Sequence, residues 1–456
     1  MEKSLAIKFK LEANGFQVKV FSGKKYFIKY PPDIFSHFPE KGKKFLLANF
    51  IYARTRSLAL QADYFLNYQT AKPYLKNFID WGITGDLGRI ADLNDLPTEA
   101  LLKKFRSSQN NLAFAAGQSV SRLPIFNRSL ANQAIVAMSF GKDSLLSYGL
   151  AKEIGLKLTL AADLDKQNYT ATAWQHRTAI FNSFQLQEQQ KLHGFYDNVD
   201  TLLVNHRIAK PLDDLEGLNG MLAFYLEFMP MAYHFRTQYL IFGNEQNLND
   251  CYINKSGYKS YPSFDQSSAY VKKFNQHLGK LTGNKLQIVS LVEPLYNLAE
   301  MKILFGRYPH LAKYIMSCYP RQIYPGRWCH HCAMCAKAFL YAAASGGDPK
   351  TMKMARPMFS AKDREFYPLF AKTITRPYEK PVAVREEQLL AFLLAYQNGW
   401  RGYLMDLFAK KYLAAAKRKE KFLRQKFFGL HPAPNLPVNI KNKVLTIYHQ
   451  ELDNLA

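Results

Sequence analysis

The middle of the chain alternates short apolar runs with segments of helical spacing. Four apolar runs predict buried strands, at 134–138, 157–162, 201–204 and 238–242. Helices are predicted between them, at 143–153 and 218–235. Strands that alternate with helices indicate βαβ units and a parallel sheet. Because ligands of such sheets bind beyond the carboxyl ends of the strands, functional side chains are expected directly after each run.

The two flanks show other patterns. Partial alternation near the N-terminus predicts strands at 5–11, 17–21 and 25–30, and later segments predict helices at 71–81 and 98–105. After about residue 346 the chain is mostly helical, as at 386–397. We therefore predict three units: an α+β accessory domain over 1–127, a parallel-sheet α/β domain over 128–345, and a basic helical region over 346–456.

The charge of the 456-residue chain predicts a polyanionic partner. It has 61 Lys and Arg against 36 Asp and Glu, which gives a net charge of +25. Such an excess attracts nucleic acid, nucleotides or an anionic membrane surface. Segment 408–428 holds eight cations and the single acid Glu420. This basic helix could bind nucleic acid or another polyanion, or it could be a solvated helix face, which is the commoner meaning of one charge run.

Apolar run lengths and cysteine usage bear on the compartment. The first residues form no apolar signal core, and no run reaches the roughly 18 apolar residues of a membrane span. Four of the five cysteines fall between 318 and 335. That clustering favours a metal site in a reducing compartment over a disulfide framework. We expect a cytoplasmic protein with no membrane span; a homodimer is plausible, and the oligomeric state stays open.

A turn of small and polar residues follows the first strand of the α/β part. It reads Ser139-Phe140-Gly141-Lys142-Asp143-Ser144 and leads into a helix. At such a junction, free backbone N–H groups and the helix dipole bind phosphate. Gly141 allows close approach of a ligand, the serine hydroxyls offer hydrogen bonds, and Lys142 adds positive charge. The turn is therefore a candidate phosphate loop.

Asp143 is the unexpected member of this loop. A carboxylate beside phosphate is repelled unless a cation bridges the two, so Asp143 is expected to bind Mg²⁺. The loop lacks the G-x-x-x-x-G-K-[ST] spacing of a Walker loop. The alternative is an ordinary capped turn, in which Ser and Asp begin the helix. Because the motif and its context agree, phosphate binding is the favoured interpretation.

The four clustered cysteines have the spacing C-x10-C-x2-C-x2-C and are Cys318, Cys329, Cys332 and Cys335. Residues three apart on a knuckle before a helix can direct their sulfurs at one centre. A fourth thiolate from the preceding loop completes a tetrahedron, which suits structural Zn²⁺. An iron–sulfur cluster and a set of unliganded buried thiols are the alternatives. Cys251 stands apart from this group.

Polar residues also follow the other predicted strands. The fourth strand ends in Gly243-Asn244-Glu245, within a polar run that extends to residue 250, and this run is expected to bind substrate. Glu245 could hold a second metal or position a nucleophile. Asp163 and Asp165 follow the second strand and could bind a ribose or cap the next helix. His206 follows the segment predicted as the third strand and is a candidate general base.

The loop at 139–144 resembles the Ser-Gly-Gly-x-Asp-Ser pyrophosphate loop of the PP-loop ATP pyrophosphatase superfamily, with Phe140 in place of the first Gly. Together with the downstream cysteines, the layout is similar to the 7-cyano-7-deazaguanine synthase group. A strand ending in Gly-Asn-Glu and a Trp-Cys-x-x-Cys-x-x-Cys site also resemble the UDP-muramoyl-dipeptide epimerase group. In both groups ATP activates a carboxylate. The resemblance covers about 130–345 by motif order.

The resemblance implies an adenine-nucleotide α-hydrolase-like core with a structural zinc knuckle. It also implies an ATP-dependent ligase or synthase that adenylates a substrate carboxylate or carbonyl and releases pyrophosphate. A nucleophile, ammonia in the deazaguanine group, then displaces AMP. Lys142 would stabilise the charge that builds on the leaving pyrophosphate. The adenosine would lie near Asp163 and Asp165.

Two rival functions remain. The net charge also suits an RNA-modifying PP-loop enzyme of the tRNA-thiolation or lysidine type. The second rival is a nucleotide-binding component of a multi-protein system, such as antiviral defence, that has lost turnover. Phe140 is the one sequence feature that favours the second rival.

Overall fold

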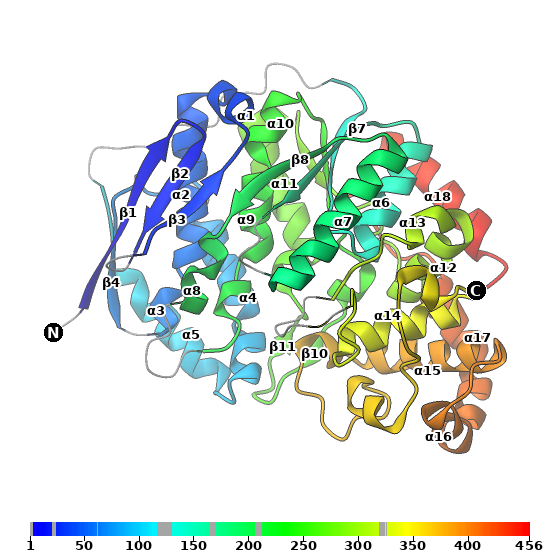
Figure 1. Ribbon diagram of the computed structural model, residues 1–456. Coiled ribbons are helices and arrows are strands. Elements are labelled where there is room, and N and C mark those ends of the chain that lie inside the picture. Colours follow the sequence, from blue (N-terminus) through cyan, green and yellow to red (C-terminus); the bar gives the residue numbers. More distant parts are fainter. Residues whose placement is uncertain are drawn as a thin grey trace.

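The computed structural model of the chain describes residues 3–20, 24–61, 63–115, 130–164, 169–205, 212–318, 324 and 326–456. In this part of the chain, ten strands form one mostly parallel sheet (Figure 1). The strands are β1 (Lys3–Glu12), β2 (Gly15–Lys19), β3 (Tyr26–Lys29), β4 (Tyr64–Tyr68), β5 (Leu112–Phe114), β6 (Gln133–Ala137), β7 (Lys157–Asp163), β8 (Leu192–Asp197), β9 (Tyr239–Ile241) and β12 (Gln287–Val289).

The strand order is β12-β9-β6-β7-β8-β3-β2-β1-β4-β5. From β12 to β8 all neighbours pair in parallel. The pairs β8–β3, β3–β2 and β2–β1 are antiparallel, and β4 and β5 continue in parallel beyond β1. A separate hairpin pairs β10 (Tyr252–Ile253) with β11 (Lys259–Ser260). One half of the sheet is therefore a βαβ structure, and the N-terminal strands extend it sideways.

Alternate residues of the central strands point to opposite faces of the sheet, as the two-residue period of a strand requires. On β6, Ala134 and Val136 belong to one apolar core and Ile135 to the other. On β9, Tyr239 and Ile241 belong to the first core and Leu240 to the second. Because both faces are buried, these strands read as continuous apolar runs rather than as alternating ones.

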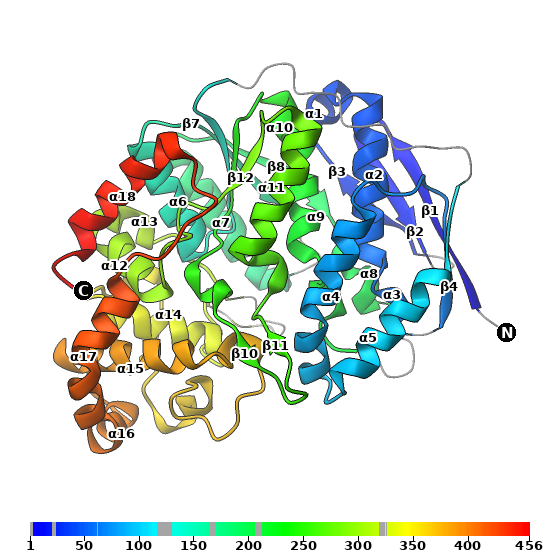
Figure 2. The same ribbon diagram turned by 180° about the vertical axis from the view of Figure 1, so that it is seen from behind.

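Helices cover both faces. The first core includes residues of α6 (Lys142–Glu153), α7 (Ala171–Glu188), α12 (Asn297–Arg307), α13 (Pro309–Ala312), α14 (Ala333–Ala344), α15 (Val382–Gln397), α16 (Tyr403–Lys411), α17 (Leu413–Phe428) and α18 (Val438–Leu452). The second includes residues of α1 (Pro32–His37), α2 (Glu40–Thr55), α3 (Leu58–Gln61), α4 (Lys76–Leu93), α5 (Thr98–Ser107), α8 (Leu202–Asn205), α9 (Gly220–Glu227), α10 (Met229–His234) and α11 (Ser268–Thr282). Figure 2 shows α2, α4 and α11 on the second face.

Most predicted elements of the central part are present. The runs at 134–138, 157–162 and 238–242 form β6, β7 and β9, and the segment at 143–153 forms α6 within one residue. The α/β class and the parallel sheet are thus confirmed. No described helix is both long and apolar enough to cross a membrane.

The predicted strand at 201–204 is wrong. A 3₁₀ turn at Val199–Thr201 and the short helix α8 occupy that segment. The third parallel strand is β8, whose sequence mixes polar and apolar residues without a clear period. A short apolar run does not distinguish a strand from a buried helical turn. Tertiary pairing with β7 decides that β8 is extended.

Two predicted helices begin or break elsewhere. The segment at 218–235 forms α9 and α10, separated at Phe228, because Pro230 lies in the first turn of α10 and has no N–H to continue α9. The helix predicted at 71–81 begins only at Lys76. Strand β12 was not predicted, because its three residues are too few to show a period.

The N-terminal strands and the α/β part share buried contacts as well as a sheet. Ile28 of β3 lies opposite Asp197 of β8. Arg54 of α2 is buried, and its Nη2 lies 3.3 Å from Asp197 Oδ2 and 3.2 Å from Glu227 Oε1. The predicted boundary at 127 falls in 116–129, outside the described residues, and the division into three units remains a prediction.

Substituting Arg54 with Met tests these buried ion pairs. The variant leaves two buried carboxylates without a cation, so we expect its free energy of unfolding to fall by about 3–5 kcal/mol. Burial raises the pKa of Asp197 to about 7 and the pKa of Glu227 well above its usual range. Protonation removes the unpaired charges at low pH. The loss of free energy of unfolding, measured by urea denaturation, should therefore be larger at about pH 8 than at about pH 5.5.

The matched control is Lys44→Met, because Lys44 is exposed on the same helix α2. Its free energy of unfolding should change by less than about 0.5 kcal/mol. If both variants lost the same free energy of unfolding, and that loss did not change with pH, the Arg54 ion pairs would not join the two parts of the sheet.

Candidate functional site

A cavity of about 720 Å³ opens at the carboxyl ends of β6, β7 and β9. From β6 the chain runs outward to β7 and β8 on one side, and it then crosses to β9 and β12 on the other side of β6. The direction of winding therefore reverses between β6 and β9. Open α/β sheets bind ligands at such a switch point. Ser139 and Ser144 line the cavity after β6, Asp163 lines it at the end of β7, and Glu245 lines it after β9.

Three distant parts of the sequence form the other walls. Helix α9 contributes the apolar side chains of Met221 and Phe224, and α14 contributes Ala333, Met334 and Lys337. A third wall comes from the C-terminal region, which contributes Phe366, Tyr378, Glu379, Val384, Glu387 and Gln388. The cavity therefore depends on residues from two of the three predicted units.

Phe140 turns its ring away from the cavity. The residue has φ 59°, a left-handed conformation that glycine adopts without strain. Its ring is fully buried, with centroids 4.9 Å and 5.1 Å from those of Phe181 and Phe184 on α7. The side chain is not part of the cavity lining. Burying the ring stabilises the fold by about 1.5–3 kcal/mol, which offsets a cost of about 1–2 kcal/mol for the left-handed backbone. Because the ring points away, it does not narrow the cavity.

The polar groups of the loop surround the start of α6. Ser139 Oγ accepts a hydrogen bond from the Gly141 N–H at 3.3 Å and lies 3.3 Å from Ser144 Oγ. Gly141 is the N-cap of α6, and no side chain caps the helix there. The first N–H groups of this 12-residue helix therefore remain available to a ligand anion.

Three carboxylates meet beside this helix start. Asp143, Glu245 and Glu300 each offer an oxygen, and these oxygens lie within 4.8 Å of one another. We call these three residues the carboxylate cluster. Glycine at 243 is required for it, because a Cβ there would lie only 2.5 Å from the Asp143 Cβ. Hard carboxylate oxygens are the donors that Mg²⁺ prefers, and Glu300 Oε1 is buried with no hydrogen-bond partner, so the cluster fits a divalent cation.

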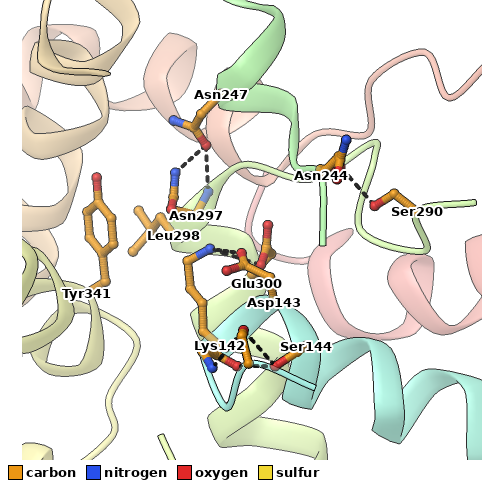
Figure 3. A network of polar contacts seen from close by, with 12 residues as sticks. Lys142, Asp143, Ser144, Asn244, Asn247, Ser290, Asn297, Leu298, Glu300 and Tyr341 are labelled. Atoms are coloured by element: carbon orange, nitrogen blue, oxygen red, sulfur yellow. Dashed lines mark hydrogen bonds and ion pairs between the residues drawn. The ribbon is translucent and has the colours of Figure 1, made fainter. Parts of the chain in front are cut away.

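Lys142 supplies a positive charge to the carboxylate cluster. Its Nζ lies 3.0 Å from Glu300 Oε2 and also contacts the Asp143 carboxylate (Figure 3). Lys142 is only 8% exposed and does not line the cavity. The structure thus places this ammonium among carboxylates, beside the cavity rather than in it.

The pKa values in the cluster move in opposite directions. Burial is the largest single influence on Asp143 and would raise its pKa, but Lys142, Glu300 and Lys337 together outweigh burial and lower that pKa. Burial, followed by the charge of Asp143, raises the pKa of Glu245 and of Glu300. Carboxyl groups whose pKa values are shifted in opposite directions within one cluster are typical of functional sites.

The first turn of α12 holds Glu300 in place. Asn247 Oδ1 accepts a hydrogen bond from the Asn297 N–H at 3.0 Å (Figure 3). Glu387 Oε1 accepts one from the Leu298 N–H at 2.8 Å. The other oxygen of Glu387 accepts hydrogen bonds from Asn247 and from the Tyr341 hydroxyl. A buried glutamate of α15 therefore caps the helix that carries Glu300.

Two cations line the cavity among the described residues. Lys337 projects from α14 and acts through its charge on Asp143 and Glu245. Arg177 of α7 lies with its guanidinium 5.0 Å from the ring centroid of Tyr169 and 5.1 Å from that of Phe181. Neither was predicted to face a nucleotide, because no local motif marks them.

The four clustered cysteines converge on one centre, as predicted. Their sulfurs lie within 4.8 Å of one another, with Cys335 Sγ 3.7 Å from Cys329 Sγ and 3.5 Å from Cys332 Sγ. A tetrahedron with Zn–S bonds of about 2.3 Å has sulfurs about 3.8 Å apart. Hydrogen bonding to Cys318 lowers the pKa of Cys332 towards the thiolate form that binds metal. The group can therefore hold a metal ion such as zinc.

This cysteine site also positions a wall of the cavity. Cys332 is the N-cap of α14, and its sulfur accepts a hydrogen bond from the Cys335 N–H at 3.4 Å. Ala333, Met334 and Lys337 lie on the first turns of the same helix. A metal held by the four thiols would fix the direction in which Lys337 leaves the helix.

The other predicted site residues have different outcomes. Asp163 lines the cavity and accepts a hydrogen bond from the Asp197 N–H at 3.4 Å. Asn244 lines the cavity too, but its amide nitrogen donates to Tyr225 Oη and to the Gln266 carbonyl, a supporting role. Asp165 and His206 lie outside the described residues. His206 also loses its expected setting, because α8 rather than a strand precedes it.

Glu300 was missed by sequence analysis. The signal that could have found it is Asn297-Leu-Ala-Glu300, a polar residue followed three positions later by Glu, which marks a helix start. That start follows β12, the strand that was also missed.

Neither a scan of protein-family models nor a search of the curated proteins finds a match to this chain. The resemblance to the PP-loop superfamily therefore rests on the motifs and their arrangement.

Removing one thiol tests the metal site. We expect elemental analysis to find about one zinc per chain, and Cys335→Ser to lose it because three thiolates cannot complete the tetrahedron. The variant should also unfold at lower urea concentration. Cys251→Ser is the control, since Cys251 is exposed and outside the cluster. Iron in the wild type, or no metal at all, would contradict the zinc assignment.

Proposed function

We propose that the chain is an ATP-dependent enzyme that adenylates a substrate carboxylate or carbonyl oxygen. The observation that carries this proposal is the meeting of an uncapped helix start with the carboxylate cluster at one wall of a cavity. A helix start binds phosphate and a carboxylate cluster binds Mg²⁺, so the two together suit a nucleotide–metal complex.

In this proposal the β and γ phosphates lie against 139–144 and the first turn of α6. Asp143, Glu245 and Glu300 would hold Mg²⁺, which when bound neutralises phosphate charge. Asp163, at the end of the neighbouring strand β7, would bind the ribose. Lys337 lines the same cavity from α14 and would also contact the phosphates.

The reaction would be an in-line displacement at the α phosphorus. A substrate oxygen forms a bond to that phosphorus, the bond to the bridging oxygen of the β phosphate breaks, and pyrophosphate leaves with that oxygen. Lys142, Lys337 and the N–H groups of α6 would stabilise the charge on the leaving group. A nucleophile then attacks the activated carbon and releases AMP. Met221 and Phe224 of α9 would contact the apolar part of the substrate.

Asp143→Asn tests the reaction. We expect wild-type protein, incubated with ATP, Mg²⁺ and a small-molecule extract of cells, to form AMP and pyrophosphate in ³¹P NMR spectra. The variant should form them at least about 100-fold more slowly, because an amide does not balance the metal charge. It should also bind α,β-methylene-ATP with Mg²⁺ more weakly in calorimetry, with an unchanged circular dichroism spectrum.

Asp213→Asn, a change at an exposed aspartate, is the matched control and should retain both properties. ADP and phosphate as products would contradict the proposed cleavage position. Equal AMP formation by wild type and Asp143→Asn would contradict the role of the carboxylate cluster.

A second candidate function is nucleic-acid binding by α16 and α17. The buried side of these helices packs into the first core, and six cations on the other side are exposed: Lys410, Lys411, Lys417, Arg418, Lys419 and Lys421. Phe422 is 54% exposed in the same stretch and could stack on a base. This arrangement favours an RNA substrate or an RNA-bound form of the enzyme.

The double substitution Lys417→Glu/Lys421→Glu tests this surface. We expect its affinity for an oligoribonucleotide of about 20 nucleotides, measured by fluorescence anisotropy, to fall about tenfold and to depend less steeply on salt. Lys103→Glu/Lys280→Glu changes the net charge equally at exposed sites elsewhere and should bind as wild type does. Equal affinities of the two double variants would rule out a specific role for α17.

A further inference from the structure

Lys142 has a role in this structure that its position in the phosphate loop does not explain. It is the first residue of α6, where its side chain could reach a phosphate at the helix start. Instead, its ammonium contacts Asp143 and lies 3.0 Å from Glu300 Oε2 (Figure 3). The lysine is thus the counter-cation of the carboxylate cluster.

The cluster requires such a cation. Its three carboxylates come within 4.8 Å of one another, and Glu300 is fully buried, so their mutual repulsion is poorly screened. Lys142 offers one ammonium to two of the carboxylates, and Glu300 Oε1 still has no hydrogen-bond partner. One ammonium therefore satisfies the cluster only in part, and a divalent cation would compete for the same oxygens.

We propose that a divalent cation displaces the Lys142 ammonium from the carboxylate cluster and that the freed ammonium then binds the phosphates of the nucleotide. Lysine has a flexible four-carbon stem, and Lys142 begins the helix that faces the phosphates, so rotation of the side chain suffices. The inference rests on the proposed nucleotide site. It adds that the metal ion first displaces Lys142, and that Lys142 then binds the phosphates.

A direct consequence is that metal and nucleotide assist each other. While the ammonium stays on the cluster, it repels an incoming cation and lowers its affinity. A phosphate group that accepts the ammonium removes that competitor, so the metal binds more tightly. By linkage, the metal strengthens nucleotide binding by the same factor.

The test measures binding of Mn²⁺ alone, by the loss of the free-ion signal in electron paramagnetic resonance. We expect Lys142→Met to bind Mn²⁺ about tenfold more tightly than wild type, because the competing charge is gone. Lys152→Met is the matched control, since Lys152 lies on the same helix with a side chain 54% exposed and pairs with Glu188. It should bind Mn²⁺ as wild type does.

A folded Lys142→Met variant that binds Mn²⁺ no more tightly than wild type would overturn the inference. If that variant does not fold, acetylation of Lys142 in the wild-type protein, followed by mass spectrometry, gives the second measurement. We expect Mn²⁺ to increase the labelling of Lys142 several-fold and to leave Lys152 unchanged. Labelling of Lys142 that does not rise with Mn²⁺ would overturn the inference.

Neither measurement involves ATP, so its outcome is separate from that of the proposed reaction. Competition between Mn²⁺ and Lys142 without AMP formation would refute only the adenylating function. AMP formation without such competition would refute only the role of Lys142.

Discussion

The meeting of three carboxylates at the end of a parallel sheet is the constraint on which the rest of the site depends. Asp143, Glu245 and Glu300 belong to three segments far apart in the sequence, and because Glu300 is fully buried their mutual repulsion is poorly screened. Three features accommodate these carboxylates. Lys142 lies between Asp143 and Glu300, glycine at 243 allows the segment after β9 to approach α6, and a cap from Glu387 fixes the first turn of α12. Each of these features would be costly without the others.

The C-terminal helices are part of the site rather than an appendage. Glu387 of α15 accepts a hydrogen bond from the backbone of α12, and residues before and within α15 close one side of the cavity. The cysteine cluster has a comparable role, because it sets the start of α14 and hence the position of Lys337. A metal at the four thiols and the chemistry proposed for the cavity are therefore linked through one helix.

Phe140 shows how a departure from a motif can be accommodated. A bulky residue in a left-handed conformation costs backbone energy, and the fold recovers it by burying the ring between Phe181 and Phe184 of α7. Phe140 therefore supports the loop from the side of α7, and its side chain lies outside the cavity lining.

The sequence alone determined the local features: the buried strands β6, β7 and β9, the turn at 139–144, and the four cysteines that converge. These follow from periodicity, turn chemistry and close spacing, which act over a few residues. Only the tertiary structure decided that β8 is extended, that Glu300 joins Asp143, and that Lys142 points at carboxylates rather than into the cavity. The pairing of β8 with β7 joins residues 32 positions apart, and the contact of Lys142 with Glu300 spans 158 positions, so no local pattern carries that information.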